Sequence, residues 1–241
     1  AARPAAMAEG TAELFNELSF HLLSYLEEQA GVSELAFENR TGCTPEDVFA
    51  WERTNAPYKL PGDLKAFLAA FDGLRFSWRV DMTNRGNITV GSMRLHRLRD
   101  VLQLPLDADD DDGLRGGLRK CDDDDGDGRP GEGQVLAAFG IEHYPRVGRV
   151  ALLFRGEPNA SGASPKASVW FQDLACKWHY VSPSFTHYFR LMVVHLGIIG
   201  WQYAYTDIGL DNVTRQWMRL YCPERLAADD ALDLEADAGD D

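Results

Sequence analysis

The chain has 241 residues, of which 45% are hydrophobic and 11% aromatic, enough for one large domain with a packed core. No stretch approaches the about 18–20 apolar residues that a membrane span needs, and residues 1–10 lack the apolar segment of a signal peptide. The pattern favours an intracellular protein that does not contact membranes. No two cysteines form a CxxC pair, so free thiols are favoured over a zinc site at Cys43, Cys121, Cys176 and Cys222.

The formal net charge of −14 comes from two acidic segments. Residues 107–133 hold eleven acidic and four basic side chains, and residues 227–241 hold seven acidic and no basic ones. The rest of the chain is therefore formally neutral. Runs of Asp repel phosphate, which argues against nucleic-acid binding. Neither segment has enough apolar residues to offset the entropy of ordering, so we expect an acidic insertion at 107–133 and a disordered acidic tail at 226–241.

The N-terminal part of the chain has helical patterns. Over residues 11–31, apolar side chains recur every three or four positions until Gly31. Thr44 before Pro45 predicts a helix N-terminus, and Pro57 ends that helix. A third helix is predicted to run from about residue 60 to Gly73, with an apolar face made of Leu64, Phe67, Leu68 and Phe71. We expect an N-terminal helical segment at 11–56 and a main domain at 57–225.

The middle of the chain has the two-residue period of strands. Strands are predicted near residues 76–80 and 88–90, and a short amphipathic piece covers 95–104. After the acidic insertion, four β-like runs follow one another with tight connections, at residues 135–141, 149–154, 168–171 and 176–181. Consecutive short strands favour an antiparallel sheet over βαβ units.

The C-terminal part returns to helical patterns. A helix is predicted from Ser184 to Gly197, followed by an aromatic-rich unit at 201–221 with a helix over 211–220. The order of helices, mainly antiparallel sheet and helices predicts an α+β fold.

Few residues match a known chemical site. Asp123, Asp125 and Asp127 match the first half of a calcium loop, but Gln134 stands where the loop needs a bidentate Glu. We interpret this run as a solvated acidic loop with weak cation binding at most. The histidines form no HExxH motif, and no phosphate-binding or nucleophile motif occurs. We therefore predict no catalytic residue, no cofactor site and no metal site.

The aromatic unit near the C-terminus is either core or binding surface. Aromatic side chains are enriched at interface hot spots, but they also close a domain when a terminal segment folds over a sheet. We favour core for most of them and predict partner contacts for a minority drawn from Trp201, Tyr203, Tyr205 and Trp217.

One motif resembles a known superfamily. The sequence LPGDLKAF at 60–67, followed by FDG at 71–73, resembles the signature of the Smi/Knr (SUKH) superfamily, in which Asn is commoner at the position of Asp72. The resemblance implies an α+β Smi/Knr-like domain that binds other proteins.

A second set of motifs is similar to the subunit 2 family of the tubulin polyglutamylase complex. These motifs are WFQD at 170–173, WHY at 178–180, FTHYFRL at 185–191, HLG at 195–197, WQYAYT at 201–206 and QW at 216–217. The resemblance departs at the C-terminus, which is acidic here and basic in that family.

The resemblance implies a non-catalytic scaffold or adaptor subunit. Its partners would be other subunits of a polyglutamylase complex, with microtubules contacted indirectly, in the cytoskeleton at the ciliary axoneme, basal body or centrosome. The alternative is a structural axonemal protein that reuses the fold without a role in glutamylation.

Overall fold

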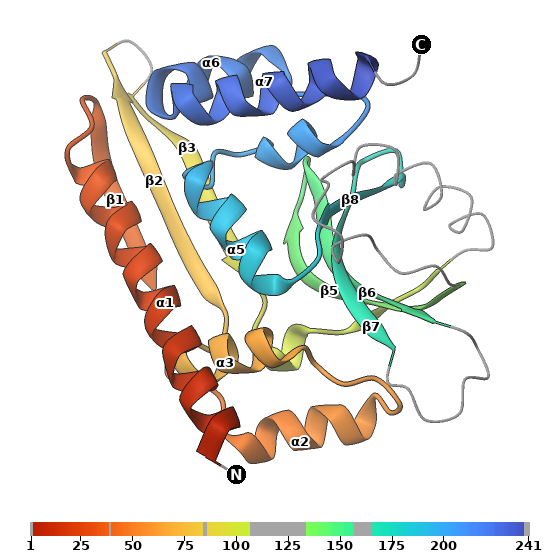
Figure 1. Cartoon of the computed structure of the whole chain (residues 1–241). Helices are drawn as coiled ribbons and strands as arrows, with labels where there is room; N and C mark the ends of the chain where they lie inside the picture. The colour runs from red at the N-terminus through yellow and green to blue at the C-terminus, as the bar shows by residue number, and fades with distance from the viewer. Residues whose placement is uncertain (1, 39, 84–85, 107–133, 157–164, 239–241) are drawn as a thin grey trace.

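The computed structural model describes residues 2–38, 40–83, 86–106, 134–156 and 165–238 (Figure 1). Its helices, with 3-10 helices labelled η, are α1 (Ala2–Glu27), α2 (Pro45–Thr54), α3 (Gly62–Ala70), η1 (Leu98–Asp100), α5 (Phe185–Val194), η2 (Trp201–Tyr205), α6 (Asn212–Tyr221) and α7 (Pro223–Ala238). Its strands are β1 (Val32–Glu38), β2 (Leu74–Met82), β3 (Gly86–Leu95), β4 (Gln103–Leu104), β5 (Gln134–Tyr144), β6 (Gly148–Gly156), β7 (Lys166–Gln172) and β8 (Trp178–Ser182).

The strands form one antiparallel sheet in the order β1-β2-β3-β5-β6-β7-β8, with β4 paired to β5. The two parts of the sheet, β1–β3 and β4–β8, are joined by a single register pair between Leu95 and Glu142. The loop after α5 also hydrogen-bonds to β3: the Ser92 N–H donates to the Gly197 carbonyl at 2.7 Å. The prediction of an α+β fold with a mainly antiparallel sheet is confirmed.

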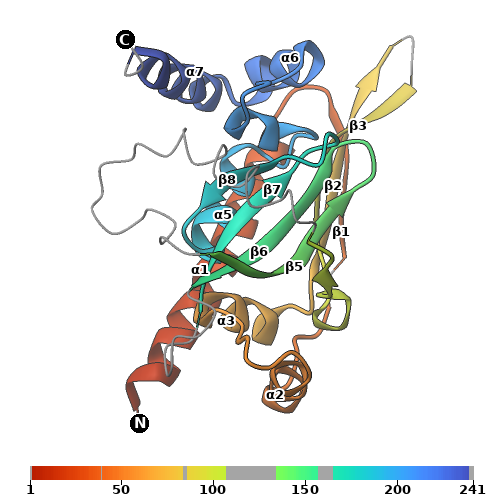
Figure 2. The same ribbon diagram turned by 90° about the vertical axis from the view of Figure 1, so that its right-hand side faces the viewer.

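Helices α1, α3 and α5 cover one face of the sheet (Figures 1 and 2). Aromatic side chains fill the space between them: the Phe15 ring lies 5.3 Å from that of Phe67 and 4.9 Å from that of Phe189. Burying a Phe side chain stabilises the fold by about 3–5 kcal/mol relative to Ala. Segment 11–56 therefore shares the core of the main domain. Alternate residues of β5–β8 form a second cluster on the other face of the sheet, made of Ala138, Ala151, Leu153, Trp170 and Trp178.

The N-termini of α2 and α5 are capped by the side chains that the sequence indicates. At α2 the Thr44 side chain accepts from the Asp47 N–H at 3.2 Å, and Asp47 accepts in turn from the Thr44 N–H at 2.9 Å. At α5 the Ser184 hydroxyl accepts from the His187 N–H at 3.3 Å. The predicted helices corresponding to α2, α3, α5 and α6 are confirmed.

The structure departs from the sequence-based expectations at three places. Residues 32–38 form strand β1, which the pattern did not indicate because most of its side chains are exposed and a bulge interrupts its register. Residues 223–238 form helix α7, so residue 226 does not begin a disordered tail. Leu226 and Asp229 are both buried, and Asp229 contacts His195, which lies 34 positions away in the sequence. The piece at 95–104 is split between η1 and β4.

The sequence also led to expectations about membrane spans, the run of Asp123, Asp125 and Asp127, and metal sites. None of the helices in the described ranges offers an apolar stretch of the length that a membrane crossing requires. Asp123, Asp125 and Asp127 lie outside the described residues. Within the described part of the chain, no three His, Cys, Asp or Glu side chains come together as a metal site.

Candidate functional site

Three of the four predicted partner-binding residues lie at least partly at the surface, in the C-terminal unit of η2, α6 and α7. The fourth, Trp201, is 1% exposed and its ring stacks on that of His195 at 4.5 Å. Trp201 is therefore a core residue, and the prediction that it contacts a partner is wrong for this structure. Tyr203, Tyr205 and Trp217 are half-buried. The Tyr203 hydroxyl donates to the Val147 carbonyl at 2.9 Å, which fixes η2 against the sheet.

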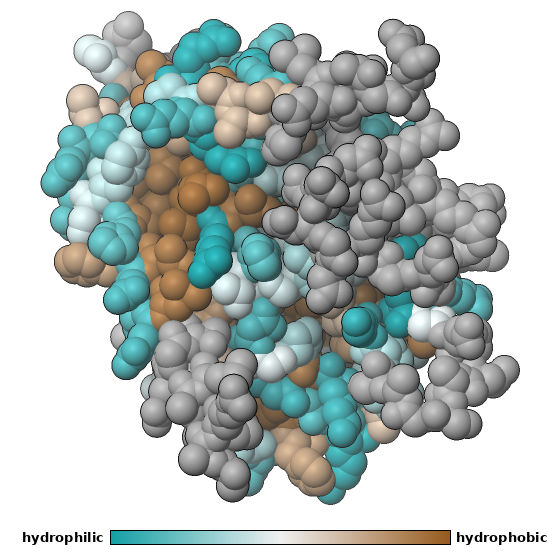
Figure 3. Space-filling view, in the orientation of Figure 1, coloured by the Kyte–Doolittle hydropathy of each residue, from teal (hydrophilic) through white to brown (hydrophobic). Residues whose placement is uncertain are grey.

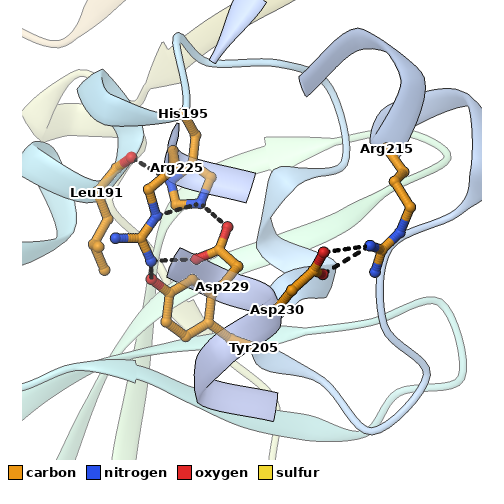
Figure 4. A network of polar contacts seen from close by, with 7 residues as sticks. All are labelled: Leu191, His195, Tyr205, Arg215, Arg225, Asp229 and Asp230. Carbon is orange, nitrogen blue, oxygen red and sulfur yellow. Dashed lines mark hydrogen bonds and ion pairs between the residues drawn. The ribbon is translucent and has the colours of Figure 1, made fainter. Parts of the chain in front are cut away.

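A buried histidine fixes the end of α5 to α7 (Figure 4). His195 Nδ1 lies 2.6 Å from the Leu191 carbonyl oxygen, and Nε2 lies 3.0 Å from Asp229 Oδ2. Arg225 also contacts Asp229, and it donates to the Tyr205 hydroxyl at 3.2 Å. Asp229 thus connects the end of α5 to α7, and Arg225 connects α7 to η2. Removing a partner from such a buried group costs about 3–5 kcal/mol, because the other charge is left without compensation.

A second ion pair joins α6 to α7 (Figure 4). Arg215 Nη1 contacts both carboxylate oxygens of Asp230, at 2.7 and 2.9 Å. At the start of α6, Asp211 accepts from the Val213 and Thr214 N–H groups at 2.8 and 3.1 Å. Burial acts to raise the pKa of Asp211, but these hydrogen bonds outweigh it and hold the pKa below its ordinary value. Helix α6 is therefore held at its N-terminus and near its middle.

The thiol in this unit is poorly suited to covalent chemistry. Cys222 is buried, and burial together with the negative charge of Asp229 raises its pKa to about 12. Since the thiolate is the nucleophile, little of it forms at neutral pH. Elsewhere, Cys176 lies exposed in a turn and His179 faces Asp173 at 3.1 Å, so the structure does not pair Cys176 with His179 as nucleophile and base.

A second buried polar group lies where α5 meets the sheet. The Tyr188 hydroxyl donates to Glu142 on β5, and Gln202 from η2 bonds to both side chains. Burial raises the pKa of the Glu142 carboxyl to about 7, although hydrogen bonds from Tyr188 and the Arg94 backbone oppose that shift. The pKa of Tyr188 is raised as well, by burial and by the charge of Glu142.

The outer face of α6 carries an apolar stripe, which we name the α6 stripe: Val213, Trp217 and Leu220. These residues are spaced by four and three positions, so they share one side of the helix. Val213 is 61% and Leu220 67% exposed, and Trp217 is half-buried with its ring stacked on that of Tyr221 at 6.2 Å. The adjacent side of α6 supplies the buried contacts, through Thr214, Met218 and Tyr221. Trp217 also packs against the core, whereas Val213 and Leu220 are mostly exposed. Contiguous exposed apolar side chains often mark interaction sites.

A further apolar area lies beside α1. Figure 3 shows it on the face that includes α1 and α5, and a shallow hollow there is lined by Ser19, Leu22, Leu23, Phe37, Leu74, Phe76, Met93, Phe189 and Val193. Most of these side chains also contribute to the core under α1, so this area is continuous with the packing of the fold.

Comparison with known proteins gives one consistent result. No family model matches the chain, and no solved structure matches it. Three curated proteins match it over most of its length, and all three carry the same name. The chain is similar to tubulin polyglutamylase complex subunit 2.

The similarity to tubulin polyglutamylase complex subunit 2 is long but distant. Identity to the rat protein is 27% over 228 residues, which cover 91% of this chain and 75% of that protein. The mouse protein is 26% identical over 226 residues, covering 89% of this chain and 73% of its own length. The human protein is 27% identical over 214 residues, covering 86% and 70%. These relatives agree with the resemblance drawn from the aromatic motifs, whereas the Smi/Knr assignment stays a prediction.

Sequence reasoning missed several residues of the C-terminal unit. Val213 and Leu220 could have been found, because they lie four positions before and three after Trp217 on a predicted helix. The pairing of His195 with Asp229 left no such signal. The two residues are 34 positions apart, and Asp229 lies in an acidic run that has the composition of a solvated segment.

Proposed function

We propose that this chain is a non-catalytic scaffold subunit of a tubulin polyglutamylase complex. The observation that carries the proposal is its similarity, over 91% of its length, to a protein named as subunit 2 of that complex. The proposed partners are the other subunits, with microtubules contacted through them. The proposed place of action is the cytoskeleton, at the ciliary axoneme, basal body or centrosome.

The surface that we propose for these contacts is the α6 stripe together with half-buried Tyr203 and Tyr205 of η2. Trp and Tyr are enriched at interface hot spots, and Trp217, Tyr203 and Tyr205 supply them here. Helix α6 is fixed by Asp211 at one end and by the pair of Arg215 with Asp230 near its middle. A surface that is already ordered loses less conformational entropy on binding.

Affinity purification from ciliated cells, followed by mass spectrometry, tests both parts of the proposal. The tagged full chain is compared with a Leu220→Asp variant and with a matched control, Leu102→Asp. Leu220 is 67% and Leu102 64% exposed, so neither substitution should disturb the fold. We expect Leu220→Asp to lower recovery of the other polyglutamylase subunits at least about tenfold, since hot-spot residues are worth about 2 kcal/mol or more. Leu102→Asp should recover them as the unaltered chain does.

The outcomes separate the two parts. If the unaltered chain recovers no polyglutamylase subunit, the proposed function is wrong. If it instead remains in the salt-resistant axonemal fraction without such subunits, the alternative of a structural axonemal protein is favoured. If Leu220→Asp recovers the subunits in full, the function stands and the α6 stripe is not the contact surface.

A further inference from the structure

Three arginines converge on one carboxylate at the end of β1. Arg40 contacts both oxygens of Glu38, through Nε at 2.9 Å and Nη2 at 2.8 Å. Arg75 Nε lies 3.6 Å and Arg97 Nη2 3.9 Å from the same carboxylate. The hydrogen bond from Arg40 lowers the pKa of Glu38, and the positive charges of the three arginines act in the same direction. Three guanidinium groups against one carboxylate leave this cluster with an excess of positive charge.

The excess charge is accessible to a ligand. The Arg75 side chain is 64% exposed, and in the described part of the chain neither Arg75 nor Arg97 contacts an acceptor other than Glu38. Arg94 lies directly opposite Arg75 in the register of β2 and β3, and adds a further positive charge to the same row. The chain as a whole carries −14, so a positive surface runs against its overall charge.

The cluster lies at the end of an edge strand. Among the described strands β1 pairs only with β2, so its other edge presents backbone N–H and C=O groups that have no strand partner. Figure 2 shows no α-helix on the outer, right-hand face of β1–β3. Two small residues lie opposite each other near the middle of β1 and β2, Ala36 and Ser77. Farther along β1, the Arg79 guanidinium lies 3.1 Å from Glu34 and is neutralised, which confines the excess charge to the Glu38 end.

We propose that the free edge of β1, together with Arg40, Arg75 and Arg97, binds an extended peptide segment rich in Glu or Asp. The peptide adds to the sheet as a further strand, and its carboxylates share the guanidinium groups with Glu38. A nucleic acid fits this surface less well, because a strand edge pairs with a peptide backbone and a sugar-phosphate backbone cannot form that pairing. The proposal goes beyond the function proposed above and depends neither on the α6 stripe nor on the similarity to known proteins.

Fluorescence anisotropy with the purified full chain and a labelled oligoglutamate peptide tests this site. We expect Arg75→Gln to weaken binding about fivefold and the double variant with Arg97→Gln to weaken it more than tenfold, in keeping with about 1 kcal/mol for each exposed charge pair. Glu38→Gln should tighten binding several-fold, because it removes the carboxylate that competes with the peptide. Arg219→Gln, an exposed arginine of α6, is the matched control and should leave binding unchanged.

The direction of the change in binding caused by Glu38→Gln distinguishes a peptide-binding cluster from one that only stabilises the fold. A cluster that only stabilises the fold predicts weaker or unchanged binding in Glu38→Gln, and that result would overturn the proposal. Equal binding of an uncharged oligoglutamine peptide, or tighter binding of a single-stranded RNA, would overturn it too. A glutamate peptide whose backbone amide nitrogens are all methylated has no N–H group to donate along an edge, so undiminished binding of that peptide would refute the added strand. Thermal melting of each variant checks that the fold is retained.

Discussion

The buried carboxyl of Glu142 should make the fold less stable as the pH rises towards neutral. Burial raises its pKa to about 7 in the folded chain, from an ordinary value of 4.5. In the unfolded chain the side chain is exposed to water and ionises near that ordinary value. Between these two pH values the unfolded chain loses the proton while the folded chain keeps it, so the free energy of unfolding falls with rising pH.

The size of the effect follows from the shift in pKa. Each pKa unit corresponds to about 1.4 kcal/mol, so Glu142 contributes about 3 kcal/mol that is present below pH 4.5 and lost above pH 7. Glu142→Gln replaces the carboxyl with a neutral amide whose oxygen can still accept from the Tyr188 hydroxyl. We expect the variant to match the unaltered chain at low pH and to exceed its stability by about 3 kcal/mol above neutral pH.

Urea unfolding followed by tryptophan fluorescence measures the effect. The informative quantity is the difference in unfolding free energy between variant and unaltered chain, taken at several pH values from about 5 to 8. This difference cancels the titration of every group that the substitution leaves unchanged, including the histidines. A difference that stays constant over this range would show that Glu142 titrates normally in the folded chain and would refute the reasoning.

Two further substitutions test the packing around the C-terminal unit. Asp229→Ala removes the acceptor of buried His195 and should destabilise the fold by about 3 kcal/mol, with faster hydrogen exchange in α7 than in the sheet. Unchanged exchange in α7 would show that the pair does not anchor the helix. Gly91→Ala should cost about 3 kcal/mol in thermal denaturation, because its Cβ would lie 1.8 Å from Trp78 Nε1. Gly62→Ala, with open space around the new methyl group, is the control and should melt close to the unaltered chain.

Local signals determined much of the fold. The Thr44-Pro45 start of α2, the Ser184 cap of α5 and the two-residue period of β2 are properties of neighbouring residues, so the sequence indicates them directly. The aromatic motifs also pointed to the family of the relatives found by comparison. Local capping and period signals and short motifs can both be found without knowing which segments meet in space.

The sequence by itself thus determined the α+β class, most helices and strands, and the resemblance to a subunit of a polyglutamylase complex. Only the tertiary structure decided that β1 is a strand, that Trp201 lies in the core and that the acidic C-terminal segment begins as helix α7. The physical reason is the same in each case. Strand β1 exists through its pairing with β2, and α7 is held by a contact between His195 and Asp229, 34 residues apart. A prediction from local composition considers each segment alone, whereas these segments are ordered by contacts with residues that are distant in the sequence.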